Sequence, residues 1–230
     1  MKAIVVTEEA AGTAGMTLVE RPEPEPAIND VAVQVRAAGF VATELAWPST
    51  WTDRLERDRT PSIPGHELAG VVTALGYGTT GLSVGQRVFG LSDWYRDGTL
   101  AERVAVEARN LAPLPGDVDF TVGASLPISC LTAWQGLFEH GRLQAGQSVL
   151  VHGAAGAVGS MAVGAAGQKL ASTSLIFSAF LPAHEEYRRD FEVPEFRLSK
   201  AVIDQHRFDF ELPRFAGFCR SGTAIQHVGL

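Results

Sequence analysis

Cysteine and long apolar runs are both scarce in this chain. Its 230 residues include two cysteines, Cys130 and Cys219, whose spacing fits neither a metal-ligand set nor a redox motif. A disulfide scaffold is implausible at this size, which makes a reducing compartment the default. No apolar stretch approaches a membrane span, and the N-terminal apolar run ends at Glu8, too early for a signal peptide. We therefore expect a soluble, cytoplasmic protein with no membrane partner.

Positive charge is also in short supply. The chain has 19 Lys and Arg against 26 Asp and Glu, a formal net charge of −7, which argues against nucleic acid or an anionic membrane as a partner. Residues 1–163 account for this excess with 11 basic and 18 acidic side chains, whereas residues 164–230 carry eight of each. The two segments therefore differ in composition.

The chain lacks internal repeats and low-complexity tracts, and its hydrophobic content of 46% is ample for a core. Short β-rich segments separated by glycine and proline predict a β-rich barrel or sandwich up to about residue 115. These segments are residues 2–6, 31–37, 68–75, 87–91 and 100–106. Apolar residues at helical spacing follow, so a change to α/β structure is expected near residues 115–125.

A glycine-rich motif follows a short β-rich run in the segment SVLVHGAAGAVGSM, residues 148–161. A strand, a tight turn and a helix N-terminus in this order form the geometry that holds a dinucleotide pyrophosphate. A purely structural turn is the alternative, because glycine-rich turns are common. The candidate cofactor-binding residues are Gly153, Ala154, Ala155, Gly156, Ala157, Val158 and Gly159.

The sequence after this motif departs from the pattern of a nucleotide-binding domain. Gly164 and Gly167 fall inside the expected helix, where each costs roughly 1 kcal/mol relative to alanine. An acidic or basic residue that selects the adenine ribose is expected about twenty residues beyond the motif. Residues 175–185 offer no clear Asp or Arg at a strand end, and His184 and Glu185, which follow a proline, are poor candidates.

A second motif, PSIPGHELAGVV at residues 61–72, places His66 and Glu67 before a strand. Alone, it is more often structural, with the imidazole capping a neighbouring backbone group. Together with its neighbours it resembles the zinc-free, quinone oxidoreductase-like branch of the medium-chain dehydrogenase/reductases. The resemblance covers residues 1–163 and rests on MKAIVV (1–6), RAAGFVATEL (36–45), GHELAGVVTALGYGTTGLSVGQRVFG (65–90), GTLAERVAV (98–106), SLPISCLTAWQGL (125–137) and VLVHGAAGAVGS (149–160).

The resemblance implies an α/β plus β fold class. A GroES-like, β-rich catalytic domain would span residues 1–120, and residues 121–163 would supply linking helices and the first strand–turn–helix of a Rossmann domain. Residues 164–230 would be an atypical tail. The implied activity is hydride transfer from NADPH to a quinone or an activated carbon–carbon double bond of a small-molecule substrate. Family members often form homodimers, so a homodimer is a further expectation.

The resemblance also implies that zinc is not used. Val41 stands where the zinc-using branch has a cysteine ligand, and Thr43 keeps the proton-relay position two residues on. A third ligand would fall near Ile128, and Cys130 lies two positions away from it. His66 and Glu67 alone do not make a catalytic zinc site, which takes three protein ligands and a water.

Further roles follow from the same resemblance. Phe40, Trp47 and Trp94 would supply walls of the substrate pocket, although each tryptophan alone is more often an ordinary core or rim residue. Tyr95 would donate a hydrogen bond to the substrate, since a phenol with a pKa near 10 is a weak acid. Thr132 would face the nicotinamide, and its alternative role is a hydrogen bond within its own helix.

Three interpretations of the tail remain open. The chain is a truncated or frame-shifted form of a normal reductase, or its tail is an alternative domain on an inactive GroES-like binding module. In the third interpretation, the tail supplies unusual strands that complete a minimal nucleotide-binding domain. A lone strand and helix would otherwise leave backbone edges and apolar surface open.

Overall fold

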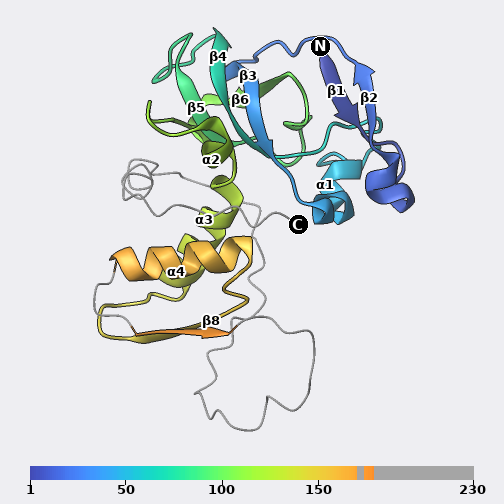
Figure 1. The fold of residues 1–230 in the computed structure, drawn as a ribbon. Helices are drawn as coiled ribbons and strands as arrows, with labels where there is room; N and C mark the ends of the chain where they lie inside the picture. The colour runs from blue at the N-terminus through green and yellow to red at the C-terminus, as the bar shows by residue number, and fades with distance from the viewer. Residues whose placement is uncertain (170–173, 179–230) are drawn as a thin grey trace. The chain divides into compact units, whose positions relative to one another are not determined.

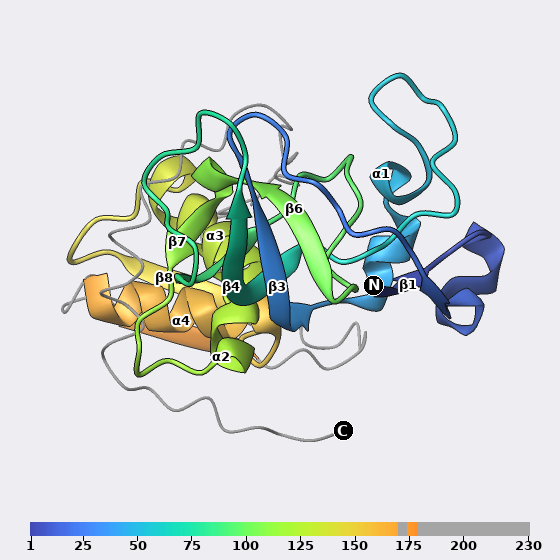
Figure 2. The same ribbon diagram turned by 90° about the horizontal axis from the view of Figure 1, so that it is seen from above.

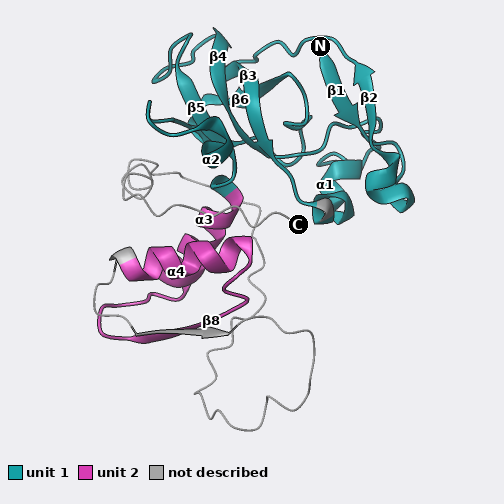
Figure 3. Cartoon of the chain, in the orientation of Figure 1, with its two compact units in different colours: residues 1–127, 210–230 teal, residues 128–209 magenta. Residues whose placement is uncertain are grey.

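The structure, a computed structural model, describes residues 1–169 and 174–178. These residues belong to two compact units, of which unit 1 contains residues 1–127 and unit 2 contains residues 128–169 and 174–178 (Figure 3). The ribose selector was expected in residues 175–185, of which residues 175–178 are described, whereas residues 179–185, including His184 and Glu185, lie outside the described residues.

A five-stranded antiparallel sheet in the order β6-β3-β4-β5-β7 forms the centre of unit 1 (Figures 1 and 2). Its strands are β3 (Asp30–Gly39), β4 (Glu67–Leu75), β5 (Arg87–Leu91), β6 (Arg103–Glu107) and β7 (Leu111–Pro113). β3 is the longest strand and pairs with both β4 and β6. Its register with β4 shifts between Ala32 and Val33 and again between Val35 and Ala37, which bends the strand.

Branched aliphatic residues fill the core of this sheet, because they pack well on a pleated surface. Eight buried residues form it: Val31, Val33, Leu68, Val72, Val88, Val104, Val106 and Leu111. They come from all five strands, so the core depends on pairings between segments distant in the sequence. Close approach of backbones accompanies this packing: an added Cβ at Gly70 of β4 would lie 2.2 Å from the carbonyl oxygen of Gln34 in β3.

A smaller hairpin begins the chain. β1 (Lys2–Val5) pairs antiparallel with β2 (Thr17–Glu20), and a 3-10 helical segment, η1 (Glu9–Gly15), connects them. The hairpin packs on the rest of unit 1 through a cluster that contains Ala3, Val5 and Ile63. The backbone N–H of Ile4 also donates to the Leu100 carbonyl at 2.8 Å.

Short helices connect the strands of unit 1. η2 (Ala42–Ala46) and α1 (Pro48–Trp51) follow β3, while η3 (Ala108–Asn110) and α2 (Phe120–Ala124) come later in the unit. Asp119 caps α2, since its side chain accepts a hydrogen bond from the Thr121 N–H at 2.8 Å. The stretch between α1 and β4 contains no helix or strand. It nevertheless positions much of the candidate site.

Unit 2 contains a parallel β–α–β arrangement. β8 (Ser148–His152) leads into α4 (Ala157–Lys169), and β9 (Ser174–Ser178) then pairs with β8 in parallel. Two helical segments precede it, α3 (Pro127–Trp134) and the π-helical η4 (Gln135–His140). A small core joins α3, β8 and α4 through the buried residues Ala133, Val151 and Ala162.

The predicted change from a β-rich domain to α/β structure is present, since unit 1 is built on an antiparallel sheet and unit 2 contains a parallel β–α–β arrangement. Of the five strands predicted up to residue 115, four match β1, β3, β4 and β5 closely, and the fifth, residues 100–106, begins at Arg103. β2 and β7 were not predicted, because TLVE and LAP are too short for a clear alternation. α4 runs through Gly164 and Gly167, and β9 lies beyond residue 163, so regular structure continues into the segment expected to be atypical.

Candidate active-site residues in the two units

The glycine-rich loop of unit 2 has the geometry of a tight strand-to-helix turn. Gly153, directly after β8, has a φ of 68°, a conformation that favours glycine. The backbone N–H of Gly156 donates to the Gly153 carbonyl at 2.9 Å, which closes the turn. α4 begins at the next residue, so the first N–H groups of a 13-residue helix follow the turn at once.

Position 159, in the first turn of α4, requires glycine because a side chain would have no room there, and not because of an unusual backbone angle. An added Cβ there would lie 2.1 Å from the Gly153 carbonyl oxygen and 2.8 Å from the Cα of Ala154. Ala155, Gly156 and Ala157 are exposed. The loop is therefore packed against its own helix on one side and accessible on the other, which suits close approach of a phosphate to backbone N–H groups.

Thr132 lies on the exposed side of α3. Its hydroxyl donates to the Ile128 carbonyl one turn earlier, at 2.7 Å. This is the within-helix hydrogen bond expected as the alternative to a cofactor contact. The hydroxyl oxygen keeps its capacity to accept a hydrogen bond.

In unit 1, two tryptophans and a histidine form an aromatic cluster, which we call the Trp47–His66–Trp94 cluster. The indole of Trp47 stacks on the His66 imidazole with ring centroids 5.8 Å apart, and the Trp94 ring lies 4.5 Å from the imidazole. The two indoles meet edge to face at 5.1 Å. Sequence reasoning proposed both tryptophans but read His66 as structural, so it missed that these three rings contact one another.

His66 is held neutral by its surroundings. Its side chain is 2% exposed, and burial lowers its pKa to about 4, with a smaller contribution from the positive charge of Arg59 and an opposing one from Asp93. Its Nδ1 lies 3.4 Å from the Ser92 hydroxyl, a long contact whose donor depends on the tautomer. At neutral pH the imidazole carries no charge, and it can donate one hydrogen bond and accept another.

A buried carboxyl group next to this cluster escaped sequence analysis. Glu44 in η2 is fully buried, and its Oε1 accepts the Val41 N–H at 3.0 Å. Burial, together with repulsion from Glu67, raises the pKa of Glu44 to about 7. A glutamate in a polar turn is normally exposed, so only the tertiary structure identifies this one.

The remaining predicted residues of unit 1 lie around these groups. Thr43 is exposed in η2, and Phe40, the residue directly after β3, is half-buried. Tyr95 follows Trp94, and its backbone N–H donates to Asp93 at 2.8 Å. The guanidinium of Arg54 lies 4.8 Å from the centre of the Tyr95 ring.

The loop that carries Trp94 and Tyr95, residues 92–97, is tied to the sheet by ion pairs. Arg96 makes a two-pronged contact with Asp30 of β3, with N–O distances of 3.2 and 2.6 Å, and also contacts Glu107 of β6 at 3.1 Å. Asp30 is 2% exposed. Asp93 pairs with Arg54 at 2.5 Å. The charged residues of the loop therefore anchor it, and the aromatic residues lie between the anchors.

In the part of the chain that the structure describes, no three His, Cys, Asp or Glu side chains are grouped so as to hold a metal ion. Val41, at the position of a cysteine ligand in the zinc-using branch, is 47% exposed. The prediction that zinc is not used stays a prediction. Among the same residues, no helix combines the length and apolarity needed to cross a membrane.

Comparison with known proteins places much of unit 1 in a family. Residues 27–116 match the model of the alcohol dehydrogenase GroES-like domain. This segment is a GroES-like domain. It includes β3 to β7, the Trp47–His66–Trp94 cluster and the loop at residues 92–97.

Relatives extend the match beyond the GroES-like domain. The rat quinone oxidoreductase is 37% identical over 136 residues, covering 59% of this chain and 40% of that enzyme. The crystal structure of the Escherichia coli quinone oxidoreductase complexed with NADPH has a TM-score of 0.64 and 25% identity, covering 78% of this chain and 52% of that one. The predicted resemblance to the medium-chain dehydrogenase/reductases is confirmed over a segment of the chain.

A third relative reaches into the C-terminal segment. The spectinabilin polyketide synthase system protein NorB of Streptomyces orinoci is 36% identical over 204 residues, covering 87% of this chain and 9% of that protein. A match of this length runs past residue 163, where the resemblance was expected to end. The chain spans from 9% to about half the length of the relatives it matches here.

Proposed function

We propose that the chain is part of an oxidoreductase that transfers a hydride from NADPH to a quinone or an activated carbon–carbon double bond, without zinc. The relatives support an oxidoreductase, and one of them is a quinone oxidoreductase complexed with NADPH. The single observation that carries the proposal is the loop between β8 and α4, in which Gly159 packs against the Gly153 carbonyl at a distance that leaves no room for a side chain.

The residues of this loop fit a dinucleotide. Residues 153–159 would hold the pyrophosphate, because the loop is accessible on one side and leads into the positive end of a 13-residue helix. The nicotinamide supplies the hydride when it is bound. Thr132 would position the nicotinamide carboxamide through its hydroxyl oxygen, which can accept a hydrogen bond while donating one to Ile128.

The GroES-like domain would hold the acceptor. The rings of Trp47 and Trp94, with the half-buried Phe40 nearby in the sequence, would give a planar acceptor an apolar wall and exclude water from it. Tyr95 would donate a hydrogen bond to the acceptor oxygen, and Thr43 would relay a proton from solvent, to which it is exposed. The family resemblance adds a homodimer to this proposal.

A titration of the purified chain with NADPH tests the proposal. Saturation should quench protein fluorescence and raise the thermal midpoint, because a ligand at a hundredfold excess over its Kd stabilises by about 2.7 kcal/mol. Gly156→Asp should abolish both effects by placing negative charge against the phosphates, since its Cβ would already lie 3.3 Å from the Gly153 carbonyl oxygen.

Gly116→Asp is the matched control. A Cβ at Gly116 meets nothing within 4 Å, and the change adds the same charge outside the loop. This variant should bind NADPH like the parent protein. The absence of any response to millimolar NADPH or NADH in the parent would overturn the proposal. The chain would then be better explained as a GroES-like binding module without redox activity.

A further inference from the structure

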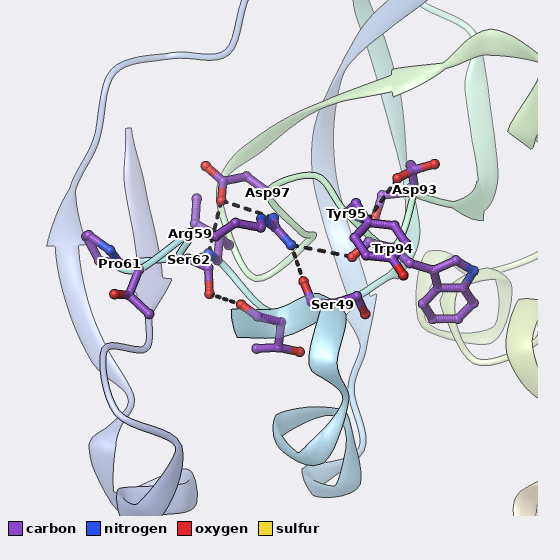
Figure 4. Close-up of polar contacts among 12 residues, drawn as sticks. Ser49, Arg59, Pro61, Ser62, Asp93, Trp94, Tyr95 and Asp97 are labelled. Atoms are coloured by element: carbon purple, nitrogen blue, oxygen red, sulfur yellow. Dashed lines mark hydrogen bonds and ion pairs between the residues drawn. The ribbon is translucent and has the colours of Figure 1, made fainter. Parts of the chain in front are cut away.

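A largely buried arginine of unit 1, Arg59, contacts backbone carbonyl groups at or near both tryptophans of the Trp47–His66–Trp94 cluster. The Arg59 side chain is 11% exposed, and one of its terminal nitrogens donates to the Ser49 carbonyl in α1, two residues after Trp47. The same nitrogen lies 3.5 Å from the carbonyl oxygen of Trp94 itself. Figure 4 shows the guanidinium between Ser49, Trp94 and Asp97.

Local structure brings Arg59 to this position. The chain folds back after α1, with an isolated bridge between Thr52 and Asp58 and a hydrogen bond from the Arg59 N–H to the Trp51 carbonyl at 2.9 Å. The other terminal nitrogen of Arg59 forms an ion pair with Asp97 at 3.8 Å. Asp97 in turn accepts the Ile63 N–H at 3.2 Å, so the cation joins three segments of unit 1.

We propose that Arg59 is a positioning residue, which fixes the separation of the two indoles in the Trp47–His66–Trp94 cluster. A planar guanidinium suits this task because its donors point in fixed directions and can reach two carbonyl oxygens and a carboxylate together. If the cluster forms the wall for the acceptor, which rests on the proposed function, then Arg59 sets the affinity for the acceptor without touching it.

The electrostatics of the cluster agree with this role. The positive charge of Arg59 lowers the pKa of His66, in addition to the larger effect of burial. Asp93 acts in the opposite direction, and the Ser92 hydroxyl contacts Nδ1 at 3.4 Å. Removing the positive charge at position 59 should therefore raise the pKa of His66, and this effect does not require contact between the two side chains.

The experiment compares Arg59→Met and Arg59→Lys with Arg57→Met. Arg57 is in the same loop, but its side chain is 72% exposed and pairs with Asp53 alone, so its loss should be silent. The His66 titration is followed by NMR and assigned with His66→Phe, and the near-UV circular dichroism of the coupled indoles reports on their arrangement.

In Arg59→Met the pKa of His66 should rise by about half a unit or more, and the indole band should change. Arg59→Lys keeps the charge but lacks the planar set of N–H donors, so the pKa of His66 should stay low while the indole band still changes. If Arg59→Met is too unstable to study, the lysine variant alone decides: an unchanged indole band overturns the proposal. The proposal also fails if Arg59→Met behaves like Arg57→Met in both measurements.

Catalysis provides an independent readout, with 1,4-benzoquinone as the acceptor and NADPH as the donor. Arg59→Lys should raise the KM for benzoquinone several-fold and leave the Kd for NADPH unchanged. An unchanged KM alongside an altered indole band would overturn the link between the cluster and the acceptor. If the parent protein reduces no quinone, the proposed function fails, whereas the two spectroscopic measurements still decide the role of Arg59.

Discussion

The two candidate regions of this molecule are built in opposite ways. The glycine loop of unit 2 is defined by contacts within seven residues, such as that between Gly159 and the Gly153 carbonyl. The Trp47–His66–Trp94 cluster of unit 1 depends on contacts between distant segments, such as the pair Arg96–Asp30, which are 66 positions apart. A motif of the first kind can be recognised in a sequence, whereas an arrangement of the second kind exists only after folding.

This difference predicts where substitutions are most harmful. Arg96→Met should have the largest effect, because it leaves Asp30 buried with one hydrogen bond from the Ala27 N–H and no charged partner. We expect a loss of about 3–5 kcal/mol in the free energy of unfolding, measured with urea. Asp30→Asn in the same background should recover part of that loss. A loss under 1 kcal/mol would show that the loop at residues 92–97 is not held by this contact.

Glu44→Gln comes next and depends on pH. The pKa of Glu44 in the folded protein, about 7, lies above its ordinary value of 4.5, so its contribution to stability is fully present below pH 4.5 and is lost as pH rises through 7. Glutamine does not ionise. The variant should therefore gain about 2 kcal/mol relative to the parent between pH 5 and pH 8.

The comparison with the parent at each pH matters here, because His66 acts in the opposite direction. Its pKa falls from 6.5 to about 4, so its contribution is present above pH 6.5 and lost as pH falls through 4. The difference between variant and parent removes this background. A difference that does not change with pH would contradict the assignment of a raised pKa to Glu44.

A local change in unit 2 should be milder for stability and more severe for binding. Gly159→Ala forces its Cβ against the Gly153 carbonyl oxygen, at a cost of about 1–3 kcal/mol. Hydrogen exchange should show this loss in α4 and β8. The affinity for NADPH should fall at least tenfold, measured by fluorescence titration. Retained affinity would mean that the loop can open without losing its ligand. The close contact at position 159 would then matter less for binding than the distances indicate.

The smallest effect on stability is expected at the exposed edge of the loop at residues 92–97. Arg54→Met removes an ion pair with Asp93 and a contact over the Tyr95 ring, but the Arg54 side chain is 57% exposed. We expect a change under about 1 kcal/mol, which shrinks further in high salt. A larger loss would mean that the exposed Arg54–Asp93 ion pair contributes as much to stability as the Arg96–Asp30 ion pair.

What could be predicted from the sequence follows the same division. The glycine loop and the strand before it were predicted, since they need only neighbouring residues. Trp47 and Trp94 were named by family resemblance, but Glu44 and Arg59 were missed, because nothing in ATEL or ERDRT distinguishes a buried charge from a solvated one. β9 was missed because its partner, β8, lies more than twenty residues earlier and pairs with it only across α4.

In the loop at residues 92–97, charged residues that hold the loop lie on both sides of its two aromatic residues. Asp93, Arg96 and Asp97 hold the loop through their side chains, and none of those contacts uses the indole of Trp94 or the phenol of Tyr95. Replacing the Trp94 indole therefore leaves these three anchors in place, although its ring contacts with Trp47 and His66 would be lost. A set of variants at position 94 alone would therefore change the aromatic cluster while the charged side chains still hold the loop.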